Sequence, residues 1–200
     1  MRLVLVVIIA YLIGSIPFGY LIVRAKGGGD VRETGSGGTG ATNVSRRAGK
    51  IAGVFTLILD AVKGATAVII AKSILNSDGT DWLIAAAAIA VIVGHIFPLW
   101  LAFRGGKGVA TGVGVFLALA PPAVLFAAVI FVAVVGWRKM ISLGSIAGAV
   151  TIPVYVWFAA NSTPLFTASL VGVLLIIFAH RENIARIRQG TEPRISSLKR

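Results

Sequence analysis

The chain has no cysteine and few acidic residues. Among its 200 residues there are 7 Asp and Glu, 19 Lys and Arg, and 2 histidines that lie far apart. The lack of cysteine excludes disulfides, thiol catalysis and cysteine-ligated metal or iron–sulfur sites. The histidines and carboxylates have no metal-ligand spacing, so we expect neither a metal ion nor a cofactor.

Charged residues of both signs are also scarce, at 13% of the chain, whereas 57% of its residues are hydrophobic. A soluble domain has about 25% charged residues. Long apolar runs recur along the sequence and predict an all-α membrane protein with one integral-membrane domain over residues 1–200. The net charge of +12 then indicates anionic partners, such as phosphates and membrane lipids, and no nucleic acid.

Most of the membrane spans are predicted from apolar runs of sufficient length. Runs at 3–23, 51–75 and 82–103 predict spans 1 to 3. The runs at 140–158 and at 165–178, with its flanking residues, predict the last two spans. We expect short polar connections between them and a basic tail after the last span.

The apolar segment at residues 109–137 decides the topology, because it is one long helix or two short ones. Pro121 and Pro122 lie near its middle, and adjacent prolines cannot both continue a helix without loss of backbone hydrogen bonds. Two crossings also place Arg138 and Lys139 on the same side as the basic residues that precede the segment, as the positive-inside rule favours. We therefore predict short spans 4 and 5, and seven transmembrane helices in all.

Seven spans place the N-terminus outside and the C-terminus in the cytoplasm. Every Lys and Arg except Arg2, Lys63 and Lys72 then lies on the cytoplasmic side. The glycine-rich segment at 24–50 is too polar for hydrocarbon, so it becomes a cytoplasmic or interfacial loop.

A basic, glycine-rich loop reads RGGKGVATG at residues 104–112, between spans 3 and 4. Gly105, Gly106 and Gly108 can adopt positive φ, so their backbone N–H groups can turn onto an anion while Lys107 supplies a charge. The pattern predicts a phosphate-binding loop, although its spacing is not that of a P-loop. The alternative is an ordinary cytoplasmic helix end, where Gly, Arg and Lys are common.

A second polar segment reaches the same predicted face and reads GSGGTGATNVSRR at residues 35–47. Ser36, Thr42 and Asn43 offer hydrogen bonds to a ligand. Arg46 offers a bidentate phosphate contact. A flexible Gly/Ser linker is the alternative for this composition.

A third segment at residues 180–192 reads HRENIARIRQGTE and has one polar and one apolar helical face. An amphipathic helix attracted to anionic lipid has the same pattern. The predicted topology brings all three segments to one face, and this convergence favours a site over three independent surface features.

Together, these motifs resemble those of the bacterial acyl-phosphate-dependent glycerol-3-phosphate acyltransferases. Their order, spacing and membrane frame match over essentially the whole chain. Gly38 and Ala179 depart from the family pattern, which usually has Asn and a basic residue there. The matching residues are Ser36, Gly37, Gly40, Ala41, Thr42, Asn43 and Arg46, the sequences GHIFP and RGGKGVAT, the segment 55–64, and His180, Asn183, Ile184, Arg186, Gly190 and Glu192.

The resemblance implies a seven-helix enzyme of the bacterial inner membrane, with its active site on the cytoplasmic side. Such an enzyme moves an acyl group from acyl phosphate to the sn-1 hydroxyl of glycerol 3-phosphate and releases lysophosphatidic acid and phosphate, the first acylation of phospholipid biosynthesis. We expect a monomer. A small-anion or phosphate transporter is the alternative, and it would need broken helices in repeated halves.

Two phosphorylated substrates require two anion pockets, and acyl phosphate is reactive enough to need no acyl-enzyme nucleophile. His180 is the candidate general base, because its ordinary pKa lies nearest to physiological pH; alternatively it only orients the substrate while a substrate phosphate takes the proton. Thr111 binds phosphate or makes a hydrogen bond at the start of a helix. The catalytic candidates are His180, Asn183 and Ser36, and the substrate-binding candidates are Arg46, Lys107, Gly105, Gly106, Gly108, Thr111, Thr42 and Asn43.

Four further residues are supporting candidates, namely Asp60, Lys63, His95 and Glu192. Asp60 and Lys63 share one face of span 2, so they pair with each other, or Asp60 orients a phosphate-binding cation from beneath. No aspartate follows His95 at the spacing of the H-x-x-x-x-D acyltransferase motif. We therefore expect His95 to anchor a loop.

Overall fold

The structure is a computed structural model that describes residues 2–77 and 81–195, and its regular elements over those residues are helices. Residues 78–80, in the predicted turn after span 2, and 196–200, in the predicted tail, lie outside the described residues. The elements are α1 (Arg2–Ser15), α2 (Phe18–Ala25), η1 (Val31–Glu33), α3 (Ala41–Ala48), α4 (Lys50–Leu75), α5 (Trp82–Ile96), η2 (Leu99–Leu101), α6 (Val109–Leu119), α7 (Pro121–Arg138), α8 (Ile141–Ala159), α9 (Thr163–Ala179) and α10 (Arg181–Arg188).

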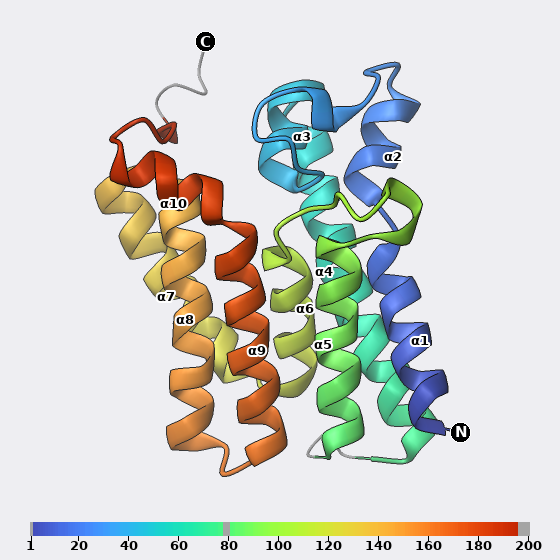
Figure 1. The fold of residues 1–200 in the computed structure, drawn as a ribbon. Helices are drawn as coiled ribbons and strands as arrows, with labels where there is room; N and C mark the ends of the chain where they lie inside the picture. The colour runs from blue at the N-terminus through green and yellow to red at the C-terminus, as the bar shows by residue number, and fades with distance from the viewer. Residues whose placement is uncertain (1, 78–80, 196–200) are drawn as a thin grey trace.

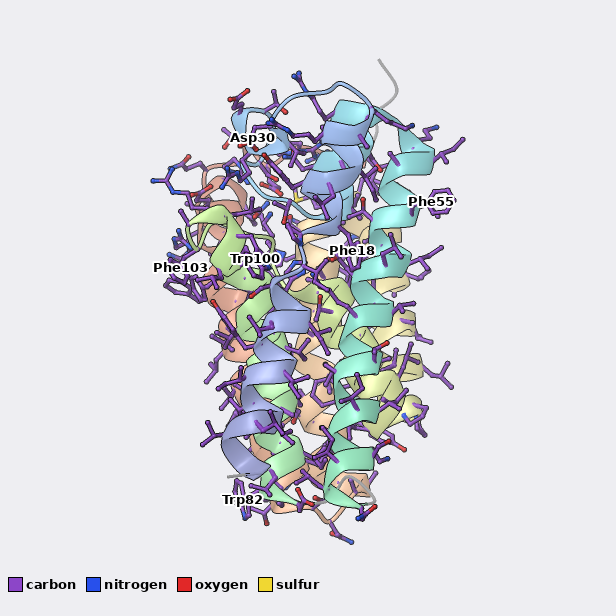
Figure 2. All side chains as sticks on the ribbon, turned by 90° about the vertical axis from the view of Figure 1, so that its right-hand side faces the viewer. Phe18, Asp30, Phe55, Trp82, Trp100 and Phe103 are labelled. Atoms are coloured by element: carbon purple, nitrogen blue, oxygen red, sulfur yellow. The ribbon has the colours of Figure 1, made fainter. Side chains whose placement is uncertain are left out.

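The long helices run side by side in one bundle, and α2, α3 and α10 gather at one end of it, uppermost in Figure 1. Five helical segments are long and apolar enough to cross a membrane, or six if α9 and α10, bent by 59°, form one broken span. The all-α membrane fold predicted from the sequence is confirmed at this level. Large apolar side chains such as Phe55, Trp82 and Phe103 project from the outer surface, as expected for lipid contact (Figure 2).

The break predicted at the proline pair is present between α6 and α7. As predicted, α6 is short, with 11 residues. The expectation of a short span 5 is wrong, because α7 has 18 residues and meets the length for crossing. Pro121 is the first residue of α7. The N–H at this position has no partner within a helix, so proline there costs α7 no hydrogen bond.

Span 1 was expected as one helix, but it is divided into α1 and α2 at Ile16 and Pro17. Pro17 has no N–H to donate, so the regular helix ends before it. The carbonyl of Ile16 instead accepts a hydrogen bond from Lys63 Nζ of α4 at 2.8 Å. A charged side chain of another helix therefore satisfies backbone at the break, as a membrane interior requires.

Glycines allow the helices to pack closely. A Cβ at Gly14 of α1 would collide with the backbone of Val91 in α5, and one at Gly64 of α4 would collide with the carbonyl of Thr111 in α6. Small residues at such crossings are typical of membrane helices, whose association depends on close backbone approach. The contacts between α1 and α5 and between α4 and α6 fix the part of the bundle that carries the polar loops.

Candidate active site

The three polar segments meet at one end of the bundle, as the sequence predicted. The N–H of Thr39, in the loop before α3, donates to the carbonyl of Gly105 at 3.3 Å and joins the first segment to the glycine loop. The charges of Arg46, Arg186 and Glu192 all act on Lys107 in this loop. Residues from α3, the α5–α6 loop and α10 thus form one electrostatic cluster.

Asn43, the third residue of α3 and buried, holds the first loop in shape. Its Nδ2 donates to the carbonyls of Val31, Thr34 and Gly38 at 2.8, 3.0 and 2.9 Å, and its Oδ1 accepts from the N–H of Ser36 at 3.2 Å. That Asn43 binds substrate stays a prediction; in the structure its amide makes its hydrogen bonds within the loop. The segment is also not the flexible linker of the alternative reading, since η1 and α3 form within it.

Ser36, Thr42 and Arg46 remain available for a ligand. Ser36 and Thr42 are half-buried, and Arg46 is exposed on α3. Their side chains make no hydrogen bond or ion pair with another residue in the described part of the chain. The first segment therefore presents two hydroxyls and a guanidinium on a scaffold held by Asn43.

The glycine loop differs from the expected anion cradle. The N–H groups of Gly105 and Gly106 donate to the carbonyls of Ile96 and His95, both at 3.1 Å, so they do not point at an anion. Only Gly108 of the three glycines has positive φ, at 81°, where it precedes α6. The predicted role of Gly105 and Gly106 as N–H donors to phosphate is corrected, and their use is close approach to the end of α5.

His95 lies directly beneath this loop, a position that suits the predicted anchoring role. A Cβ at Gly106 would collide with the ring of His95, which explains the absence of a side chain there. His95 Nδ1 lies 3.0 Å from Thr111 Oγ1, and both residues are buried. Of the two roles predicted for Thr111, the structure has the hydrogen bond near the start of α6, because its hydroxyl faces His95; a phosphate contact stays a prediction.

Asp60 and Lys63 form a buried ion pair below His95. Lys63 Nζ lies 2.8 Å from Asp60 Oδ1, which is also 3.5 Å from His95 Nδ1. The mutual-pairing alternative is therefore observed, and Asp60 forms no ion pair with Arg46 or Lys107. The pair supports the loop indirectly, through His95.

Lys107 is half-buried at the centre of the cluster. Burial lowers the pKa of Lys107 to about 8, and the charge of Glu192 opposes this shift. The positive charges of Arg186 and Arg46 favour it, since like charges disfavour protonation. At neutral pH this lysine is mostly protonated and belongs to a site with excess positive charge, which is suited to an anion.

His180 stands at the corner between α9 and α10. Its Nδ1 lies 2.8 Å from the carbonyl of Ile176, a contact that requires Nδ1 to carry the proton and leaves Nε2 as an acceptor. Burial lowers the pKa of His180 to about 4, against the effect of this backbone contact. The imidazole is therefore neutral at physiological pH.

Glu192 joins this corner to α8. Its carboxylate accepts hydrogen bonds from Ser142 Oγ, Asn183 Nδ2 and Arg186 Nε at 2.6, 2.7 and 2.8 Å. Burial opposes ionisation of Glu192, but these hydrogen bonds outweigh it and lower the pKa. Asn183 is thereby fixed with its Oδ1 buried and without a hydrogen-bond partner among the described residues.

The arrangement of cations, a neutral imidazole and a fixed amide can be compared with known proteins. A family model described as Glycerol-3-phosphate acyltransferase matches residues 4–190. The chain belongs to that family. The glycerol-3-phosphate acyltransferase of Synechococcus sp. (strain CC9902) is 44% identical over 192 residues, which cover 96% of this chain and 94% of the relative. That of Syntrophotalea carbinolica is 45% identical over 188 residues, or 94% of this chain and 95% of the relative.

Solved structures share the fold of this acyltransferase. PlsY (YgiH), an integral membrane glycerol 3-phosphate acyltransferase, is known in a glycerol 3-phosphate form that matches with a TM-score of 0.94 and 37% identity, over 100% of this chain and 98% of that one. Its lysophosphatidic acid form matches with a TM-score of 0.89 and 36% identity, over 97% and 95%. The predicted resemblance is confirmed, and the chain is an enzyme of the acyltransferase class.

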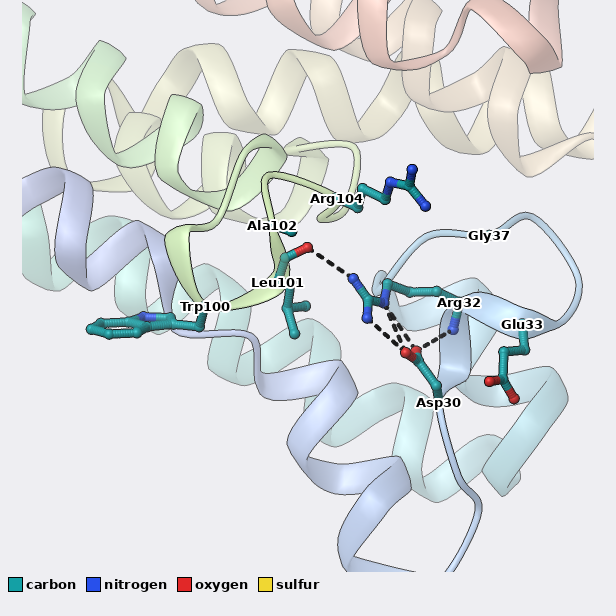
Figure 3. A pocket seen from close by; sticks show the side chains of 8 residues that line it. All are labelled: Asp30, Arg32, Glu33, Gly37, Trp100, Leu101, Ala102 and Arg104. Atoms are coloured by element: carbon teal, nitrogen blue, oxygen red, sulfur yellow. Dashed lines mark hydrogen bonds and ion pairs between the residues drawn. The ribbon is translucent and has the colours of Figure 1, made fainter.

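Sequence reasoning missed some residues that organise the acyltransferase site. Ser142 is the second residue of the apolar helix α8. Its place at the helix end was the sequence signal that its hydroxyl could contact a polar group outside the lipid. Asp30 and Arg32 precede the first motif and line a cavity of about 580 Å³ beside the glycine loop (Figure 3). Their spacing, with one residue between opposite charges, was a signal for a local ion pair.

Proposed function

We propose that this acyltransferase transfers an acyl group from acyl phosphate to the sn-1 hydroxyl of glycerol 3-phosphate. The products are 1-acyl-glycerol 3-phosphate, which is lysophosphatidic acid, and phosphate. The observation that carries the proposal is a cluster in which Lys107 and Arg46 have no ion pairs among the described residues. The charge of Arg46 acts on Lys107, and the charge of Lys107 acts on His180. Two unpaired cations suit two phosphate groups, and the solved forms of PlsY with glycerol 3-phosphate and lysophosphatidic acid support this substrate class.

The reaction requires one bond to form and one to break. The sn-1 oxygen bonds to the acyl carbon, the bond between that carbon and the phosphate oxygen breaks, and phosphate leaves with the bonding electrons. Because acyl phosphate is a mixed anhydride, positioning and stabilisation of the tetrahedral oxyanion can supply most of the acceleration. Lys107, Arg46 and the hydroxyls of Ser36 and Thr42 are the groups that we assign to these tasks.

The proton of the sn-1 hydroxyl must go to an acceptor. His180 Nε2 is an acceptor held in place by the Nδ1 contact to Ile176. A pKa of about 4 makes it a weak base, so it either takes the proton transiently or orients the hydroxyl while a phosphate oxygen takes it. The orphaned Oδ1 of Asn183 suits a hydroxyl donor of the glycerol, since a buried carbonyl oxygen without a partner is costly.

The test is an acyl-donor assay on purified protein in detergent or nanodiscs. With acyl phosphate and glycerol 3-phosphate, without acyl-CoA and without added metal, we expect equimolar lysophosphatidic acid and phosphate. Positional analysis of the product tests sn-1 attack. Folded protein that forms no product with acyl phosphate, or that requires acyl-CoA, would disprove the proposed donor.

We further propose that one domain over residues 1–200 crosses the bacterial inner membrane seven times as a monomer, with its N-terminus outside and its site in the cytoplasm. The basic ends of α2, α3 and α10 lie together at the site end of the bundle, which supports this orientation. Because the chain lacks cysteine, single cysteines at Pro122 and Arg47 can be labelled from each side. Labelling of both from the same side would contradict the seven-span arrangement.

A further inference from the structure

Arg32, just before the first motif, bridges two loops of the site end. Its Nε lies 3.0 Å from Asp30 Oδ1 and its Nη2 lies 2.7 Å from Asp30 Oδ2, while Nη1 donates to the carbonyl of Leu101 at 2.9 Å (Figure 3). Asp30 Oδ1 also accepts from the backbone N–H of Arg32 at 2.9 Å. The carboxylate of Asp30 therefore holds the guanidinium of Arg32 in one orientation, in which Nη1 reaches the backbone of η2.

The backbone that Arg32 contacts leads into an unfavourable turn. Ala102 and Phe103 both have positive φ, at 50° and 63°, although neither is glycine. Such a backbone conformation is unfavourable for a residue with a Cβ, and it persists only where surrounding contacts determine it. Gly105, whose N–H is bonded to the end of α5, comes two residues later, and Lys107 follows it.

Little protein covers the outer side of this turn. Trp100 is 60% exposed and Phe103 is 56% exposed, and both side chains project from the bundle (Figure 2). Local backbone bonds from Phe103 and Arg104 to Pro98 and Leu101 close the turn, but they do not attach it to the first loop. Within the described residues, the side-chain hydrogen bond between the turn and the first loop is that of Arg32 to Leu101.

We propose that Arg32, oriented by Asp30, is a positioning residue that clamps the turn at residues 101–103 and thereby sets the place of Lys107. The inference rests on the proposed function, because it assigns Lys107 to a substrate phosphate. Arg32 forms an ion pair with Asp30 and is not one of the cations left for substrate. Its role is geometric, and it requires the guanidinium fork, which a lysine cannot reproduce.

Arg104 provides a matched control for charge. It lines the same cavity and is exposed, and its side chain makes no hydrogen bond or ion pair within residues 2–77 and 81–195. Arg32→Ala and Arg104→Ala each remove one positive charge from the same wall, but only Arg32→Ala also removes the contact with Leu101 and the ion pair with Asp30. Arg32→Lys keeps the charge and removes the fork.

The experiment measures the KM of both substrates for these three variants and for Lys107→Ala. The substrate whose KM rises in Lys107→Ala is the one whose phosphate Lys107 binds. We expect Arg32→Ala and Arg32→Lys to raise the KM of that substrate about tenfold, with a smaller change in the KM of the other substrate. Arg104→Ala should change either KM less than about twofold. Equal effects of Arg32→Ala and Arg104→Ala, or a selective rise in the other KM, would overturn the clamp.

A readout without catalysis uses a nitroxide on Phe103→Cys, the single cysteine of the resulting chain. Arg32→Ala should increase label mobility, and Arg104→Ala should not. A lower melting temperature for Arg32→Ala, with mobility and KM unchanged, would show a merely structural role and overturn the proposal. If the parent chain makes no product but the label still loosens, the proposed function fails while the clamp stands.

Discussion

The molecule contains two groups of charged side chains: in one the charges are paired with each other, and in the other cations remain unpaired among the described residues. Asp60 and Lys63 lie in the bundle as a pair, with His95 beside them and the carbonyl of Ile16 on the lysine. Lys107, above them, has no ion pair within the described residues, although it is half-buried. The lower group is complete by itself, whereas the upper group has more positive than negative charge.

Under the proposed function, the group with unpaired cations is the one that binds an anionic ligand. Buried charges are tolerated when they are paired and hydrogen-bonded, and Asp60 and Lys63 meet both conditions. A half-buried cation without a counter-ion is costly unless an anion arrives. A phosphate at Lys107 and Arg46 would complete the upper group in the way that Asp60 completes the lower one.

The largest expected effect comes from breaking the complete group. Lys63→Met leaves Asp60 buried without its cation and should lower the free energy of unfolding by about 3–5 kcal/mol. The double variant Asp60→Asn with Lys63→Met removes both charges and should be much closer to the parent chain. Thermal unfolding in detergent compares the two. A single variant no less stable than the double would contradict the view that this group is held by mutual compensation.

A smaller effect is expected at the acceptor of the open site. His180→Ala should reduce kcat by about 10²-fold, at the lower end for general bases, because a low pKa makes the imidazole a weak base. With a pKa of about 4, His180 is already neutral at every pH well above 4, so its own titration does not change the rate near neutral pH. The parent rate should therefore show no inflection near pH 6.5.

The pH–rate profile of His180→Ala separates the two roles. A profile that keeps its shape at lower height favours orientation of the hydroxyl over proton transfer. An inflection near pH 6.5 in the parent chain that disappears in His180→Ala would contradict a buried, neutral histidine.

The smallest expected effect concerns the charge of Lys107. Its pKa of about 8 means that the cation is present below that pH and is lost above it, so phosphate binding should weaken as pH rises. At pH 9 the affinity for the substrate held by Lys107 should be about tenfold lower than at pH 7. Lys107→Arg stays charged and should remove this alkaline decline. Equal declines in the parent chain and Lys107→Arg would assign the effect to another group.

Sequence patterns predicted those parts of the fold that depend on local chemistry. The break at Pro121 and the apolar helices follow from missing donors and from run length. The break at Pro17 and the helix α3 were missed, because they depend on distant partners, Lys63 for one and the loop contacts of Asn43 for the other. A glycine-rich composition does not reveal that a side chain 5 to 12 residues further along the chain will hold the loop in one conformation.

In the site, residue types were predictable, but the directions of their polar groups were not. The cluster of Lys107, Arg46 and His180 follows from three motifs at one end of a bundle. Sequence alone could not show that the N–H groups of Gly105 and Gly106 would turn to α5, because that depends on how the loop folds back on the carbonyls there. The sequence predicted that Gly105 and Gly106 are needed as N–H donors to an anion. In the structure they are needed because a Cβ at either position would collide with His95.

The short helix α6 sets the depth at which the reaction takes place. At about 1.5 Å per residue its 11 residues reach about 17 Å, little more than half of a hydrocarbon core of about 30 Å. Thr111, in its first turn, packs on Gly64, which is near the middle of the 26-residue α4 and not at its end. Under the proposed function, if α6 reaches the outer edge of the hydrocarbon core, the loop with Lys107 lies inside the level of the lipid tails. Glycerol 3-phosphate then moves inward to the acyl chain, and the acyl chain does not have to leave the membrane.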